Sequence, residues 1–195
     1  MELSKKDKLI LWNQYEILKN LDTDKAERYE SCQKALEYGI EYVYDPSYKL
    51  ADKLTEPKPE LMDPIQAPVL EEVVDILYMY CSLYASFEEL EHSFKNEHKE
   101  KLDIILEQCM FRGFNSLPGF ERSYYLCAEW LIKYSKYFSV FKNCELKSQQ
   151  SMLNEYKQML KRYYEYVKYK ERENYVRNLS AEQIKYIIGI KYYYF

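Results

Sequence analysis

The sequence predicts an all-α protein, a single-domain bundle of about six to seven helices with no significant sheet. Three observations favour this fold class. With 195 residues the chain can bury one substantial core. Its 4 glycines and 6 prolines are too few for the many tight turns of a sandwich or barrel. Apolar residues recur every third or fourth position along most of the chain, which is typical of amphipathic helices.

The first helix is expected from about residue 5 to residue 19. Ser4 precedes it as N-cap, and Asp7 in the first turn faces the positive end of the helix dipole. Leu11, Tyr15 and Leu18 follow one another at spacings of four and three residues. This pattern predicts one apolar stripe, which the helix must bury against its neighbours.

The second helix is expected to start after Thr23 or Asp24 and to continue to near Tyr44, where the Asp45-Pro46 step ends it. Five of the six prolines then lie between positions 46 and 68. This irregular segment predicts a surface connection that contains one short helix at most. It lacks the Pro-x-x-Pro pattern with flanking basic residues that a ligand of an aromatic groove would carry.

The rest of the chain predicts four long helices and a short final one. Apolar spacing is clearest in the first of these. Gly113 is expected to end the helix at 96–110. Ser180 and Gln183 predict a capping box at the start of the helix at 180–188, which Gly189 ends. The expected ranges are 69–90, 96–110, 120–141, 149–170 and 180–188.

Charge is unevenly distributed. The formal net charge is −4, but residues 41–107 hold 6 basic and 16 acidic residues, a balance of −10, and residues 108–195 hold 15 and 8, a balance of +7. Such a chain can pair with a second copy, and it is a poor candidate for general nucleic-acid binding. Segment 155–177 alternates basic residues with tyrosines, but four glutamates reduce its charge. We expect a homo-oligomer and consider nucleic-acid binding unlikely.

No assembled reaction centre is evident in the sequence. His92 and His98 are six residues apart, so on one helix they point to opposite faces and do not form a zinc pair. The five cysteines are never closer than 17 residues, and the glycines form no phosphate-binding loop. We therefore expect no metal and no cofactor. No apolar stretch approaches the roughly 20 residues of a membrane span, so no membrane association is expected.

One carboxylate is conspicuous. Asp75 is embedded in the apolar run 73–77, and a buried carboxylate must be neutral or paired. Arg28 and Arg122 are the favoured partners. A structural ion pair is the simpler interpretation, and a ligand-binding or acid/base carboxylate with a shifted pKa is the alternative.

The C-terminal segment 190–195 is aromatic and would be a liability if it were left exposed. It either packs on its own domain or docks on a second subunit, and we favour docking. Its candidate contacts with another copy are Tyr192, Tyr193, Tyr194 and Phe195.

Several separated blocks resemble the YfbU family. They are Leu9-Ile10-Leu11-Trp12-Asn13-Gln14-Tyr15, Leu21-Asp22, Ala26-Glu27-Arg28-Tyr29, Val74-Asp75-Ile76, Met79-Tyr80, Gly113-Phe114-Asn115, Glu121-Arg122 and Asn178-Leu179-Ser180-Ala181-Glu182-Gln183-Ile184. The resemblance implies an all-helical bacterial cytoplasmic protein without an established activity. Segments 46–68 and 190–195 look like additions to the family pattern.

The functional prediction is a non-enzymatic interaction or regulatory protein that self-associates. The alternative is a helical hydrolase or nuclease that acts through Asp75, Arg28 and Arg122. A catalytic protein would bring these three side chains together in a concave pocket, whereas an interaction protein would use them to pair with one another.

Overall fold

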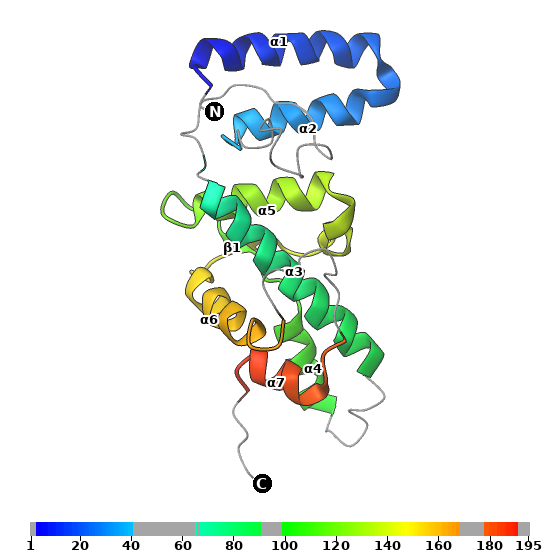
Figure 1. Cartoon of the computed structure of the whole chain (residues 1–195), viewed down its shortest axis with the longest axis vertical. Helices are drawn as coiled ribbons and strands as arrows, with labels where there is room; N and C mark the ends of the chain where they lie inside the picture. The colour runs from blue at the N-terminus through cyan, green and yellow to red at the C-terminus, as the bar shows by residue number, and fades with distance from the viewer. Residues whose placement is uncertain (1–2, 41–64, 66, 91–98, 168–177, 191–195) are drawn as a thin grey trace. The chain divides into compact units, whose positions relative to one another are not determined.

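The computed structural model describes residues 3–40, 65, 67–90, 99–167 and 178–190 (Figure 1). Within these residues it contains seven α-helices, two short 3-10 segments and one pair of two-residue strands. The predicted all-α class is therefore confirmed. None of the described helices is long and apolar enough to cross a membrane.

The chain forms two compact units. Unit 1 comprises residues 1–73 and 117–142, and unit 2 comprises residues 74–116 and 143–195. Helix α3 (Ala67–Leu90) contributes its first residues to unit 1 and the remainder to unit 2. The expectation of a single domain over 1–195 stays a prediction, and each unit is described by itself below.

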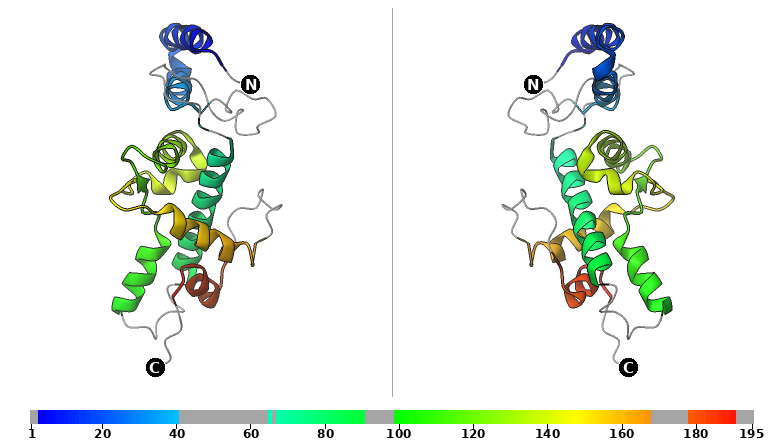
Figure 2. Two further views of the ribbon diagram at one scale, coloured as in Figure 1. Left: turned by 90° about the vertical axis from the view of Figure 1, so that its left-hand side faces the viewer. Right: turned by 90° about the vertical axis from the view of Figure 1, so that its right-hand side faces the viewer.

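Unit 1 begins with a helical hairpin. Helix α1 (Lys5–Leu21) leads through the 3-10 segment η1 (Thr23–Lys25) into α2 (Ala26–Glu37), which runs back along α1 (Figures 1 and 2). The N-terminus of α1 has a complete capping box, because the Ser4 hydroxyl accepts from the Asp7 amide and the Asp7 carboxylate accepts from the Ser4 amide. The predicted N-cap of the first helix is confirmed.

Helix α2 ends earlier than expected. Gly39 adopts a φ of 71°, its amide donates to the Leu36 carbonyl, and the Ile40 amide donates to the Ala35 carbonyl at 2.7 Å. These two bonds form a Schellman motif, which satisfies the last carbonyls and turns the chain away. The expected continuation through Ile40 was therefore wrong, because glycine stops the helix before the Asp45-Pro46 step is reached.

Helix α5 (Arg122–Tyr134) completes the described core of unit 1. The Trp130 indole, which is fully buried, donates to the Ser31 carbonyl of α2 at 2.8 Å. After α5, Ser135 is extended and its hydroxyl accepts from the Tyr137 amide, which opens the 3-10 segment η5 (Lys136–Phe141). The single helix expected at 120–141 is thus divided in two by a serine cap.

Unit 2 contains α4 (Lys99–Cys109), α6 (Leu153–Tyr163), α7 (Ala181–Ile187) and most of α3. Strands β1 (Phe114–Asn115) and β2 (Lys147–Ser148) pair in parallel. The helix expected at 149–170 starts only at Leu153, because the preceding residues pair as β2 and then turn. The predicted capping box of α7 is confirmed by reciprocal bonds between Ser180 and Gln183.

The core of unit 2 is aromatic. Tyr156 on α6 packs edge-on against Tyr80 and Phe114 with ring centroids 5.4 and 5.3 Å apart, and its ring lies 5.7 Å from that of Phe111. Its hydroxyl donates to the Gly113 carbonyl at 2.8 Å. Gly113 has a φ of 74°, and a Cβ there would lie 2.1 Å from the Leu146 carbonyl oxygen. Only glycine fits this turn.

Candidate interaction surface

The three residues of the predicted ion pair are divided between the units. Asp75 belongs to unit 2 and is half-buried, whereas Arg28 on α2 and Arg122 on α5 belong to unit 1 and are exposed. The pairing of Asp75 with Arg28 or Arg122 stays a prediction.

Other predicted features lie outside the described residues. These are the tail contacts Tyr192 to Phe195, both histidines and almost all of segment 46–68. In the part of the chain that is described, no group of three or more His, Cys, Asp or Glu side chains is placed to hold a metal ion.

Two glutamates of unit 1 accept hydrogen bonds from tyrosine hydroxyls. Glu129 on α5 accepts from the hydroxyls of Tyr38 at 2.7 Å and Tyr125 at 2.5 Å, and Glu72 accepts from Tyr124 at 2.6 Å. Burial, followed by the hydrogen bond to the neighbouring carboxylate, raises the pKa of Tyr38 and of Tyr124. These phenols stay protonated at neutral pH. These hydrogen bonds therefore have a structural role, because they join α5 to the end of α2 and to α3.

Four of the five thiols are poor nucleophiles. Burial raises the pKa of Cys81 and of Cys109 to about 12, and it also raises the pKa of Cys127 and Cys144. A nucleophilic cysteine needs the opposite shift, toward the thiolate. All five cysteines are free.

Helix α1 exposes most of its aliphatic side chains to solvent. Of the twelve large hydrophobic residues that are exposed in the described chain, five lie on this one helix, and the exposed fraction reaches 58% at Ile17 and 77% at Leu21. We define the outer face of α1 by these five residues: Leu9, Ile10, Ile17, Leu18 and Leu21. In Figures 1 and 2, α2 is the only described element of unit 1 that runs alongside α1.

The opposite side of α1 faces α2 and carries polar groups. Lys8 is 96% buried, since its exposed fraction is 4%. Lys19 forms an ion pair with Glu16 at 3.0 Å, and the Gln33 amide of α2 donates to the same carboxylate at 2.9 Å. Tyr15 stacks on Tyr29 with ring centroids 6.3 Å apart. The helix thus buries one charged side chain, Lys8, and leaves most of its aliphatic side chains in water.

The predicted apolar stripe of α1 is only partly confirmed. Leu11 and Tyr15 are half-buried, but Leu18 is 36% exposed and belongs to the outer face. Sequence reasoning missed the outer face because apolar residues surround this helix, so periodicity alone did not select one side. The available signal was Ile10, Ile17 and Leu21, whose spacings of seven and four residues place them on one face.

A surface of this kind can bind another protein surface by burying apolar area. Clustered aliphatic side chains on one helix favour association, whereas single exposed apolar residues are ordinary. Ile104 on α4 is such a single residue, with 54% of its surface exposed.

Comparison with known families identifies the chain. The model of the YfbU domain matches residues 1–189, which includes segment 46–68 and ends before the aromatic tail. All the blocks quoted above, from the apolar N-terminal one to the capped segment at 178–184, lie inside this match. The chain is a member of the YfbU family.

Proposed function

We propose that this protein is a non-enzymatic interaction protein that self-associates through the outer face of α1. The observation that carries the proposal is the concentration of five exposed aliphatic side chains on one helix, away from the side where Glu16 accepts from the Gln33 amide of α2. Water penalises such a face by about 25 cal/mol for each Å² of apolar surface. A partner that covers it recovers this free energy.

The chemistry of the described interior supports an interaction role over a catalytic one. The carboxylates Glu72 and Glu129 accept hydrogen bonds from tyrosines, and four of the five cysteine thiols have raised pKa values. The hydrolase or nuclease alternative rests on Asp75 with Arg28 and Arg122. Asp75→Asn tests it, because loss of a cellular phenotype with unchanged stability would support a functional carboxylate.

The proposal is tested by measuring molar mass by light scattering for the wild type and two matched variants. Ile17→Glu places a charge on the outer face, and Ile104→Glu places the same charge on an equally exposed isoleucine of α4. We expect a wild-type mass of at least twice the 23.8 kDa of one chain. Ile17→Glu should weaken association at least 10-fold, which corresponds to about 1.4 kcal/mol, and Ile104→Glu should leave it unchanged.

Two results would contradict the proposal. A wild-type protein that is monomeric at high micromolar concentration has no self-association to explain. Equal weakening by Ile17→Glu and Ile104→Glu would show that the effect belongs to added charge in general. Circular dichroism of both variants checks that the helices are retained.

A further inference from the structure

We infer that α1 pairs antiparallel with α1 of a second copy, about a two-fold axis that passes between Asn13 and Gln14. This inference rests on the proposed self-association and specifies its geometry. In such a pair, residues whose numbers add up to 27 lie opposite one another. The outer face of α1 would then be self-complementary, as a two-fold interface requires.

The spacing of the isoleucines supports this register. Ile10 and Ile17 lie on one face of α1 and are equally distant from the midpoint between Asn13 and Gln14, so Ile10 of one copy meets Ile17 of the other. Both are well exposed, at 45% and 58%. Two packed helices approach to about 8–10 Å between axes, which brings these side chains into contact.

The charges at the two ends of α1 also support antiparallel pairing. Residues 4–8 contain three lysines and one aspartate, a net charge of +2, and residues 16–25 contain three acidic residues and two lysines, a net charge of −1. Antiparallel pairing places Lys6 opposite Leu21, whose aliphatic surface the Lys6 stem can cover. Parallel pairing would bring like charges together at both ends. Charge thus favours a second copy of α1 as the occupant.

Helix dipoles act in the same sense. The positive N-terminal end of one α1 would lie beside the negative C-terminal end of the other. The helix has 17 residues and is about 25 Å long at 1.5 Å per residue. Its outer face therefore extends over the whole length of the proposed contact, from Leu9 and Ile10 near one end to Leu21 at the other.

Disulfide trapping in the full-length chain tests the geometry. The background is Cys144→Ser, because Cys144 is the least buried of the thiols with raised pKa values. Ile10→Cys and Ile17→Cys are prepared separately, oxidised alone and as a mixture, and analysed by mass spectrometry. In the antiparallel register, Ile10 of each copy lies about 10 Å along the axis from its own equivalent, beyond the Cβ separation of a disulfide.

We expect each variant alone to form few crosslinks and the mixture to form the mixed disulfide at least 10-fold faster. Crosslinking of each variant to itself, without preference for the mixed species, would indicate parallel pairing and overturn the inference. The background protein without a new cysteine controls for crosslinks through the four remaining thiols.

Light scattering on the same samples separates the two levels of the proposal. A dimer with no mixed disulfide would overturn the antiparallel register and leave self-association standing. A monomer would overturn both. A dimer that is lost when residues 191–195 are deleted, and that forms no mixed disulfide, would assign association to the C-terminal tail instead.

Discussion

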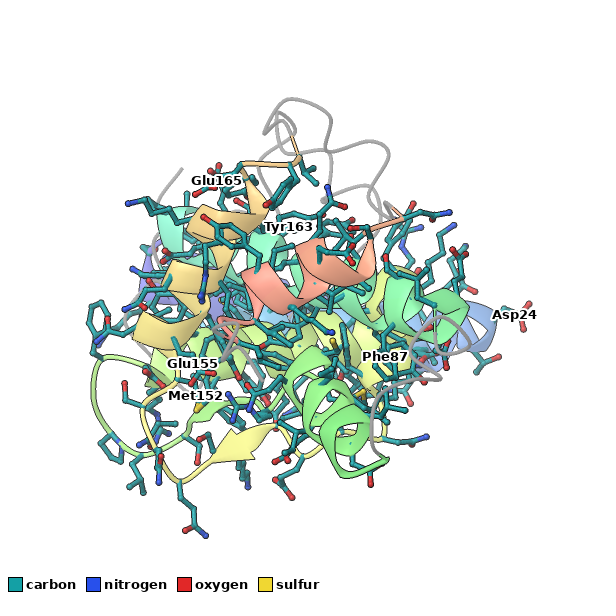
Figure 3. All side chains as sticks on the ribbon, turned by 90° about the horizontal axis from the view of Figure 1, so that it is seen from below. Asp24, Phe87, Met152, Glu155, Tyr163 and Glu165 are labelled. Atoms are coloured by element: carbon teal, nitrogen blue, oxygen red, sulfur yellow. The ribbon has the colours of Figure 1, made fainter. Side chains whose placement is uncertain are left out.

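Helices α1 and α6 distribute the same kinds of residue in opposite ways. On α6 the apolar side chains are buried and the polar ones Asn154, Glu155, Lys157 and Gln158 are exposed. Glu155 and Tyr163 of this helix are labelled in Figure 3. On α1 the most exposed side chains include Ile17 and Leu21, and a lysine is buried. The buried side chains of α6 are Leu153, Tyr156, Met159, Leu160 and Tyr163.

The difference shows which apolar side chains are covered by the same chain. Tyr156, Met159 and Tyr163 of α6 contact residues of unit 2, whereas α1 meets α2 through polar and half-buried groups. The stability of α6 therefore depends on the core of unit 2. The outer face of α1 contributes little to folding of one chain and becomes useful only when another surface covers it.

The largest expected effect is the loss of a ring from α6. Tyr156→Ala removes a fully buried side chain that contacts three other rings, and we expect the free energy of unfolding to fall by about 3–5 kcal/mol. Ile17→Ala, in protein dilute enough to be monomeric, should change it by less than about 0.5 kcal/mol. Urea unfolding followed by circular dichroism measures both. Similar losses for the two variants would remove the contrast between the helices.

A smaller effect is expected from the hydroxyl of the same residue. Tyr156→Phe leaves the buried Gly113 carbonyl without this donor and should cost about 1–3 kcal/mol. Tyr186→Phe removes an exposed hydrogen bond to Glu165 and should cost less than about 0.5 kcal/mol. The same unfolding measurement compares them. An unchanged stability of Tyr156→Phe would mean that packing alone holds α6.

The smallest expected effect is alkaline destabilisation of unit 2. Burial raises the pKa of Tyr80 and of Tyr156 in the folded state. As the pH rises, the unfolded chain therefore loses these protons before the folded one does. The contribution of the two phenols to the free energy of unfolding is complete below pH 10 and is lost as the pH rises through the pKa of the folded state. Between pH 9 and pH 11, stability should fall less in Tyr156→Phe than in the wild type, by about 1 kcal/mol. If the stability of Tyr156→Phe and of the wild type falls equally over this pH range, Tyr156 is not a source of the alkaline destabilisation.

The sequence was most informative where a local rule acts alone. Ser4 and Ser180 cap helices because a hydroxyl can satisfy a free backbone amide nearby, so both starts were predictable. Gly189 has a φ of 80° just after α7, where the helix end was predicted. These features depend on neighbouring residues only.

Features that depend on tertiary packing could not be read in the same way. The end of α2 at Gly39 was overlooked because the apolar spacing continues to Ile40, although the glycine could have indicated it. The outer face of α1 was missed because Leu9, Ile10 and Leu11 present apolar groups in several directions. Which side meets α2 is decided by contacts with that helix, including the Gln33 amide.

The central claim is that a second copy covers the outer face of α1. Hydroxyl-radical footprinting of the wild type over a dilution series tests it most directly. We predict that oxidation of Ile17 and Leu21 falls several-fold as protein concentration rises, while oxidation of Ile104 stays constant. Oxidation of the α1 residues that is the same at every concentration, in protein that light scattering shows to be associated, would contradict the claim.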